Sequence, residues 1–245
     1  MLKQFKADLH IHTCLSPCSD WDMSPKKIIR RSLDKGLDLI AICDHNTAEN
    51  VGAVMKAGKD QGLWVLPGIE ICSKEEVHIL ALFDELDTTL TMQDYVYANL
   101  TGNNKPEVFG YQIVANEHDE VLGENPRLLI GATQLGIYDI VEKTHSLGGL
   151  SLSSHVDRTA YGVIGQLGFI PSDLKIDGVE VSYRVSLDKA GDEVAGIGKF
   201  PCTTASDAHF LDDIGKVWTV FVIAQPSIDE IQRALRGKDG RRIMI

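Results

Sequence analysis

Short apolar runs of strand length recur along the chain, and they restrict its fold more than any other feature. The runs occupy residues 7–13, 37–44, 63–72, 77–83, 149–155, 178–182, 202–209 and 218–224. Helix-like stretches separate many of them, at residues 24–33, 48–61, 137–147, 187–197 and 227–235. The first stretch has Ser24 as its N-cap, Pro25 at the first helical position and Gly36 as its terminator. This alternation predicts βαβ units and a mostly parallel sheet, and therefore an α/β fold.

Residues 84–133 depart from this alternation of predicted strands and helices. The segment is long and polar in its middle, with short apolar pieces at residues 111–114 and 121–123. We expect a two-stranded, hairpin-like excursion, which is either a lid over a functional site or a plain surface hairpin. Because the chain contains no linker and no internal repeat, we expect residues 1–245 to form a single domain.

The composition is that of an ordinary globular protein, with 44% hydrophobic and 24% charged residues. No apolar run approaches the roughly 20 residues of a membrane span, and the N-terminal residues lack the apolar centre of a secretory signal. Five cysteines in a chain of this length do not indicate a disulfide framework. We therefore expect a cytoplasmic protein with reduced thiols and no membrane partner.

The chain is acidic, with 24 Lys and Arg against 35 Asp and Glu and a formal net charge of −11. This charge repels polyphosphate backbones, so a small phosphorylated substrate is favoured over nucleic acid. Short nucleic acids are not excluded, because divalent cations in a cleft would offset the carboxylates around them. The oligomeric state stays open.

Most of the 8 histidines lie at or beside the ends of the apolar runs. Parallel α/β sheets gather the C-terminal ends of their strands on one face, where sequence-distant histidines would meet. His10 and His12 are two apart on one predicted strand, so they point the same way and could hold one cation. Any one histidine could instead be an ordinary core or surface residue, and the prediction rests on the pattern.

Carboxylates occupy matching places at Asp8, Asp44, Glu70 and Asp207. Imidazole together with carboxylate oxygen suits Zn, Mn or Fe rather than Ca or Mg. Asp8 and Asp44 each lie close to a histidine, so they either orient imidazoles through hydrogen bonds or form structural salt bridges.

These residues occur in a definite order along the chain. The stretches are Asp8-Leu9-His10-Ile11-His12-Thr13, Asp44-His45-Asn46, Pro67-Gly68-Ile69-Glu70 with His78 after it, Ser154-His155, and Ala205-Ser206-Asp207-Ala208-His209. Their order and spacing resemble the successive motifs of the PHP (polymerase and histidinol phosphatase) family from residue 7 to about residue 222. The resemblance implies a distorted (β/α)7 barrel, two or three divalent metal ions at its C-terminal face, and hydrolysis of phosphate esters.

The resemblance also implies which residues bind metal. His10, His12, Glu70 and Asp207 would hold one ion, and Glu70 would bridge to a second ion held by His78 and His155. His45 and His209 would belong to a third site, which in relatives takes a further His or Asp from the loop after the first motif. We expect Asp20 to be that ligand, although Cys18 lies at a similar spacing and would favour the softer Zn or Fe.

Taken together, the sequence predicts a metal-dependent phosphoesterase that uses a metal-activated hydroxide. Its substrate would be a small metabolite, a nucleotide or a short oligonucleotide, and Glu70, Asp207 and Arg158 are the candidate catalytic residues. Arg158 is the first candidate for a phosphate clamp and Arg184 the second, since guanidinium groups bind phosphate in a bidentate way. Two other functions stay open: a non-catalytic metal-binding module, and a metal-dependent hydrolase of C–N bonds.

Overall fold

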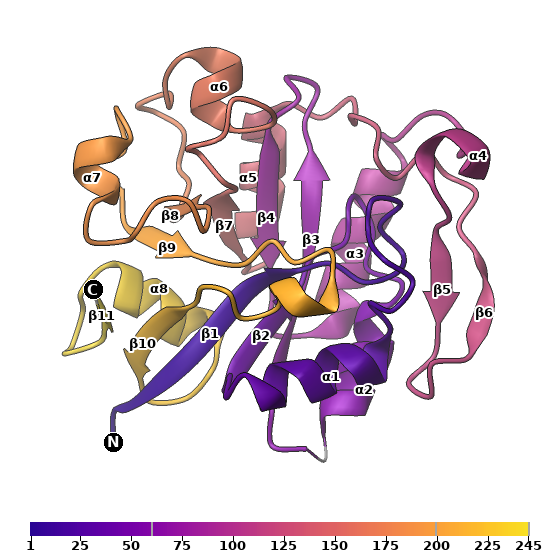
Figure 1. Ribbon diagram of the computed structural model, residues 1–245. Helices are drawn as coiled ribbons and strands as arrows, with labels where there is room; N and C mark the ends of the chain where they lie inside the picture. The colour runs from indigo at the N-terminus through magenta and orange to yellow at the C-terminus, as the bar shows by residue number, and fades with distance from the viewer. Residues whose placement is uncertain (60, 199, 245) are drawn as a thin grey trace.

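A nine-stranded sheet forms the body of the protein and curls into a nearly closed barrel (Figure 1). The computed structural model describes residues 1–59, 61–198 and 200–244. The strand order is β11-β10-β1-β2-β3-β4-β7-β8-β9. The strands are β1 (Lys3–Ile11), β2 (Leu39–Ile42), β3 (Trp64–Cys72), β4 (His78–Leu82), β7 (Leu150–Ser153), β8 (Gly178–Val181), β9 (Cys202–Thr204), β10 (Thr219–Ile223) and β11 (Arg242–Met244).

The barrel closes where the chain leaves β9 and meets the end of β1. The Ala208 N–H donates to the carbonyl of His10 at 3.3 Å, and the His12 N–H donates to the carbonyl of Ala208 at 3.0 Å. β10 pairs antiparallel with the first half of β1, and β11 pairs with β10. The strands from β1 round to β9 therefore form the expected distorted (β/α)7 barrel, to which β10 and β11 are added as antiparallel strands.

β4 reverses the direction of the sheet. It runs antiparallel to both β3 and β7, whereas β1, β2 and β3, and likewise β7, β8 and β9, run parallel to one another. The start of β4 therefore lies at the same edge of the sheet as the ends of the parallel strands. His78 is the first residue of β4. It therefore lies beside the histidines at the C-terminal ends of the parallel strands, although it is at the N-terminal end of its own strand.

Eight α-helices and a short 3-10 helix, η1, surround the sheet in the described ranges. They are α1 (Pro25–Asp34), α2 (Val51–Lys59), α3 (Leu86–Tyr97), α4 (Pro106–Phe109), α5 (Ile137–Ser146), α6 (Val163–Leu167), α7 (Ala190–Glu193), α8 (Ile228–Leu235) and η1 (Leu211–Asp213). No helix among them is long and apolar enough to cross a bilayer.

One predicted helix was wrong in its extent, and one helix was missed. The helix expected at residues 187–197 is reduced to α7, because glycines at 191, 196 and 198 weaken a helix there. The excursion at residues 84–133 contains the helix α3 as well as the expected strand pair. The buried face of α3 includes Thr89 and Gln93, so its apolar period was too weak to be recognised.

The expected hairpin of the excursion consists of β5 (Ile113–Ala115) and β6 (Val121–Glu124), which stand at the right side of the barrel in Figure 1. The hairpin packs against the loop that follows β1. The Ile113 N–H donates to the carbonyl of Cys14 at 3.0 Å, and the Asn50 amide bonds to the backbone of Ile113 and Ala115. Gly110 has a φ of +98°, and a Cβ there would lie 2.2 Å from the Pro17 carbonyl oxygen. The excursion therefore supports the loop after β1.

Apolar side chains of the strands alternate between two buried clusters. In β2, Leu39 and Ala41 belong to the cluster that also contains the apolar face of α8, whereas Ile40 and Ile42 belong to the larger cluster with α1 and α2. In β1, Ala7 and Leu9 join the α8 cluster and Ile11 joins the other, although all three are odd-numbered. The register of β1 against β2 shifts between Asp8 and Ile11. This irregularity lets the even-numbered His10 and His12 face the interior at the end of the strand.

Candidate metal centre

Glu70, near the end of β3, is the centre of the histidine cluster. Its carboxylate is buried, and its oxygens lie close to the ring nitrogens of histidines from several strand ends. The closest contacts are 3.0 Å to Nδ1 of His45 and of His78, 3.3 Å to Nε2 of His10 and of His155, and 3.5 Å to Nε2 of His12. The barrel thus brings together residues that lie far apart in the sequence.

Polar atoms at this centre are buried without hydrogen-bond partners. Both Glu70 oxygens, Nδ1 of His78 and Nδ1 of His155 lack a well-aligned partner among the described residues. Unpaired buried polar groups are costly, so they are rare unless a ligand satisfies them. Neutral imidazoles and carboxylates are ligands of divalent transition metals, and the residues present therefore fit such ions.

Three overlapping groups of side chains offer ligand atoms that lie within 4.8 Å of one another. They are His10, His12, Glu70 and Asp207; His45, Glu70 and His78; and His12, His45 and His209. The first group contains the four residues that the sequence assigned to one ion. In the second group, His45 stands where the resemblance placed His155, and His155 approaches the same Glu70 carboxylate from β7.

Asp20 and Cys18 differ in how they meet this cluster. The Asp20 carboxylate accepts a hydrogen bond from the Asp22 N–H at 2.8 Å, and Asp20 lies in none of the three groups. The Cys18 side chain is exposed and lies near His45 and His209. Partial burial of the thiol raises its pKa, but its interactions with these two histidines, chiefly with the charge of His45, outweigh this effect and lower the pKa to about 6. Neither side chain belongs to the three groups, and the Asp20 N–H itself donates to the His209 carbonyl at 2.9 Å, so Cys18 is favoured for the third site only by its lowered pKa beside these histidines.

Asp44 acts on His12 through a serine. The Ser16 hydroxyl donates to Asp44 Oδ1 at 2.7 Å, so its oxygen accepts from Nδ1 of His12 at 2.9 Å. This arrangement leaves Nε2 of His12 unprotonated and directed at Asp207, 3.1 Å away. The Asp44 carboxylate also accepts from the backbone and hydroxyl of Thr13. The expected orienting role of Asp44 is thus visible in these contacts.

Glu180 at the end of β8 is a further residue of the centre that the sequence did not single out. Its Oε1 lies 3.0 Å from Nδ1 of His10 and receives a weaker bond of 3.4 Å from the His155 N–H. It therefore fixes the ring of His10 with Nε2 facing Glu70. Only its position at a strand end, like that of Glu70 on β3, could have indicated this role.

Asp8 holds the loop that carries Asp207. Its carboxylate accepts hydrogen bonds from the Ser206 N–H at 2.9 Å and the Gly215 N–H at 3.0 Å. Burial raises its pKa to about 6 in spite of these bonds. Asp8 thus positions the backbone of this loop and makes no contact of this kind with an imidazole.

Interactions within the cluster lower the pKa values of two carboxylates, Glu70 and Asp207, and of one histidine, His12. Burial alone would raise the pKa of Glu70, but the charges of His78 and His10 hold it well below its usual range. Asp207 is held low in the same way, chiefly by His10. Burial, with the charges of His209 and His45, lowers the pKa of His12. Glu180 and Glu70 raise the pKa of His10 despite its burial, so of these groups the two carboxylates and His12 already have the charge that metal binding requires, and His10 would lose a proton on binding.

Two of the predicted ligands have left-handed backbone conformations. His155 has a φ of 30° and Asp207 a φ of 50°, a region that non-glycine residues rarely occupy. His155 lies two positions after the end of β7 and Asp207 three positions after the end of β9, where the chain turns away from the barrel. Such strain persists where the surroundings enforce it, and it is concentrated at functional sites.

Arg158 borders the cluster from the loop after β7. Its guanidinium donates to Oδ2 of Asp207 at 2.6 Å, while Oδ1 of Asp207 faces the histidines. Arg184 is exposed and lies farther out, and the two arginines line the same pocket of about 370 Å³. Both candidate phosphate clamps therefore lie on one side of the metal centre.

Comparison with protein families identifies the chain. The PHP domain matches residues 8–165, and a PHP-associated region matches residues 191–238. The chain belongs to the PHP family. The resemblance seen in the sequence is thereby confirmed.

Individual PHP relatives cover only part of this chain or exceed it in length. A 5'-3' exoribonuclease of Haemophilus influenzae is 33% identical over 90 residues, which are 35% of this chain and 32% of that protein. The lesion-specific endonuclease Q of Pyrococcus furiosus has a TM-score of 0.73 at 19% identity, over 99% of this chain and 58% of that one. Endonuclease Q in complex with a 27-mer duplex with an abasic lesion at the active site also gives 0.73, at 21% identity, over 99% and 59%. The chain thus spans about a third of the exoribonuclease and under two thirds of the endonuclease, and these structures share its fold.

Proposed function

We propose that this PHP protein hydrolyses a phosphate ester at the Glu70 cluster with the help of divalent metal ions. The observation that carries this proposal is the buried Glu70 carboxylate, with imidazole nitrogens within 3.5 Å and no well-aligned hydrogen-bond partner for either oxygen among the described residues. The substrate class extends from a small phosphorylated metabolite or nucleotide to a short oligonucleotide.

In this proposal, Glu70 would contribute to the binding of two ions. His10, His12 and Asp207 complete one site, and His78 completes the other with His45 or His155. Zn, Mn and Fe suit these donors. A third ion would be held by His45 and His209, with Cys18 rather than Asp20 as the additional donor from the loop after β1.

Divalent ions bound there would polarise the phosphoryl oxygens and activate a water molecule. The chain's own residues would prepare the site for this chemistry. Glu180 and Ser16 hold the His10 and His12 rings with their Nε2 atoms toward the cluster. Arg158 orients Asp207 and offers its remaining guanidinium N–H groups to the phosphate.

Elemental analysis combined with ester hydrolysis tests this proposal. The purified protein would be loaded with Mn, Zn or Fe and assayed with p-nitrophenyl phosphate and bis(p-nitrophenyl) phosphate. We expect bound metal and metal-dependent release of nitrophenol, which a chelator abolishes and added metal restores. A metal-loaded protein that hydrolyses neither ester nor an oligonucleotide would contradict the proposal.

A further inference from the structure

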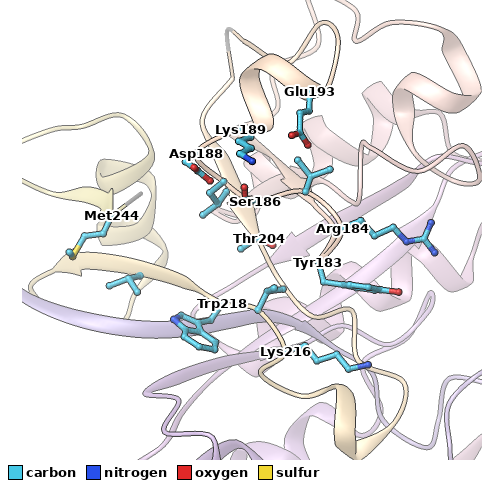
Figure 2. A pocket seen from close by; sticks show the side chains of 14 residues that line it. Tyr183, Arg184, Ser186, Asp188, Lys189, Glu193, Thr204, Lys216, Trp218 and Met244 are labelled. Carbon is cyan, nitrogen blue, oxygen red and sulfur yellow. The ribbon is translucent and has the colours of Figure 1, made fainter.

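A second pocket, of about 830 Å³, lies at the seam where β9, β10 and β11 come together (Figure 2). Thr204 of β9, Val220 of β10 and Met244 of β11 form one part of its wall, and the loop between β8 and α7 forms another. Its volume is within the range of ligand sites, roughly 300–1,000 Å³. None of the residues of the three candidate metal groups lines it.

Two exposed aromatic side chains line this pocket. Tyr183 is 47% exposed and Trp218 is 38% exposed. Cationic groups accompany both rings: Lys216 and Arg184 lie 5.8 Å from the centroid of Tyr183, and Lys6 lies 4.0 Å from that of Trp218. Exposed aromatic faces beside cations are the surface that unstacked bases of single strands use.

The charge of the pocket differs from that of the whole chain. Its lining includes the cations Arg184, Lys189 and Lys216 against the acids Asp188 and Glu193, whereas the chain has a net charge of −11. Lys216 is already paired with Asp213, so Arg184 and Lys189 are the cations of the lining that would meet an anionic ligand. The aromatic rings favour a ligand that also carries a planar, apolar group.

The pocket continues toward the metal centre through two arginines. Arg184 lines both this pocket and the adjoining 370 Å³ pocket, whose lining includes Arg158. Arg158 in turn contacts Asp207 at 2.6 Å. In Figure 2, the Tyr183 and Arg184 side chains extend toward the same side of the pocket. Arg158, Arg184 and Tyr183 therefore lie in this order from Asp207 to the second pocket.

We propose that the pocket of Tyr183 and Trp218 binds a base of single-stranded nucleic acid, whose phosphates follow Arg184 and Arg158 to the metal centre. This inference rests on the proposed function and narrows its substrate class to a strand that extends beyond the scissile phosphate. A small phosphomonoester has no second group to reach the pocket, whereas a base one or more nucleotides away does.

Binding of a short phosphorothioate oligothymidylate with a fluorescein label would test the inference, because this probe resists hydrolysis by the metal-loaded protein. Fluorescence anisotropy would compare the wild type with Tyr183→Ala and Trp218→Ala. The matched controls are Tyr138→Ala and Trp64→Ala, whose side chains are 46% and 52% exposed and lie elsewhere. We expect each pocket variant to bind about tenfold more weakly, the controls to bind normally, and Tyr183→Phe to retain binding because it keeps the ring.

Kinetics with bis(p-nitrophenyl) phosphate separate the two proposals. Tyr183→Ala should leave kcat and KM for this small ester unchanged. Oligothymidylate binding that Tyr183→Ala does not weaken, or a wild type that hydrolyses the ester but does not bind the strand, would overturn the inference alone. Strand binding that depends on Tyr183 in a protein without any esterase activity would overturn the proposed function. The assignment of the pocket as a binding site for single-stranded nucleic acid would then still hold.

Discussion

The Glu70 cluster and the Tyr183 pocket are opposite kinds of site. The cluster is buried, and its imidazoles are fixed by carboxylates and a serine, whereas the pocket is open and has exposed rings and cationic side chains. Buried and oriented ligands suit a reaction centre, and exposed aromatic surfaces suit contact with a larger substrate. Substitutions in the cluster should therefore impair the hydrolysis of every phosphate ester, whereas substitutions in the pocket should impair only the binding of extended substrates.

The largest effect is expected for Glu70→Gln. Loss of the bridging charge should reduce bound metal and lower kcat for small and large esters alike by roughly 10²–10³-fold or more. Elemental analysis and nitrophenol release would measure both. Glu230→Gln is the control, since Glu230 is a buried acid in α8 that pairs with Arg241 at 2.7 Å. Normal hydrolysis by Glu70→Gln would show that the cluster is not the reaction centre.

Glu180→Gln should have the next largest effect. Without the carboxylate, the His10 ring loses its fixed orientation, and metal affinity or activity should fall about 10–100-fold. Competition with a chromogenic chelator would measure the affinity, with Glu142→Gln on the exposed side of α5 as the control. Unchanged affinity together with unchanged activity would remove Glu180 from the centre.

Arg158→Ala should raise KM for small and large phosphate esters about tenfold while the metal content stays constant. The reason is that one guanidinium both borders Asp207 and faces the path of the substrate. Arg236→Ala, which removes an arginine on the α8 side of the protein, should leave KM unchanged. An effect of Arg158→Ala on oligonucleotides alone would place this residue with the Tyr183 pocket instead of the cluster.

The smallest effect concerns the third site. In metal-free protein, Cys18 should react with iodoacetamide faster as the pH rises through about 6, because the thiolate is the reactive form. Cys14, in the same loop, has its pKa raised to about 12 by burial and should stay unreactive. Mass spectrometry after digestion would assign the labelled cysteine.

Paired variants separate the two candidate ligands of that site. Cys18→Ala should lower the metal content, whereas Asp20→Ala should not, because the Asp20 carboxylate is engaged by the Asp22 N–H. Loss of metal in Asp20→Ala alone would restore the assignment made from sequence spacing.

The strands were predictable because each is specified by its own residues. Apolar runs such as 63–72 and 149–155 satisfy strand periodicity locally, and β3 and β7 formed there. Helix α3 was missed because Thr89 and Gln93 occupy its buried face, where tertiary contacts rather than periodicity stabilise it. The side chain of Gln93, for example, accepts a hydrogen bond from the Ala48 N–H at 2.8 Å.

By itself, the sequence determined the α/β class, the family and the set of histidines and carboxylates, because short motifs at strand ends carry this information locally. The tertiary structure decided how those residues meet. The reversal of β4 brings His78 to the other strand ends, and β8 places Glu180 against His10 from 170 positions away. Likewise, the loop after β1 brings Cys18 near His45 and His209. Contacts between residues so distant in the chain depend on how the sheet curls, which the pattern of a single strand does not specify.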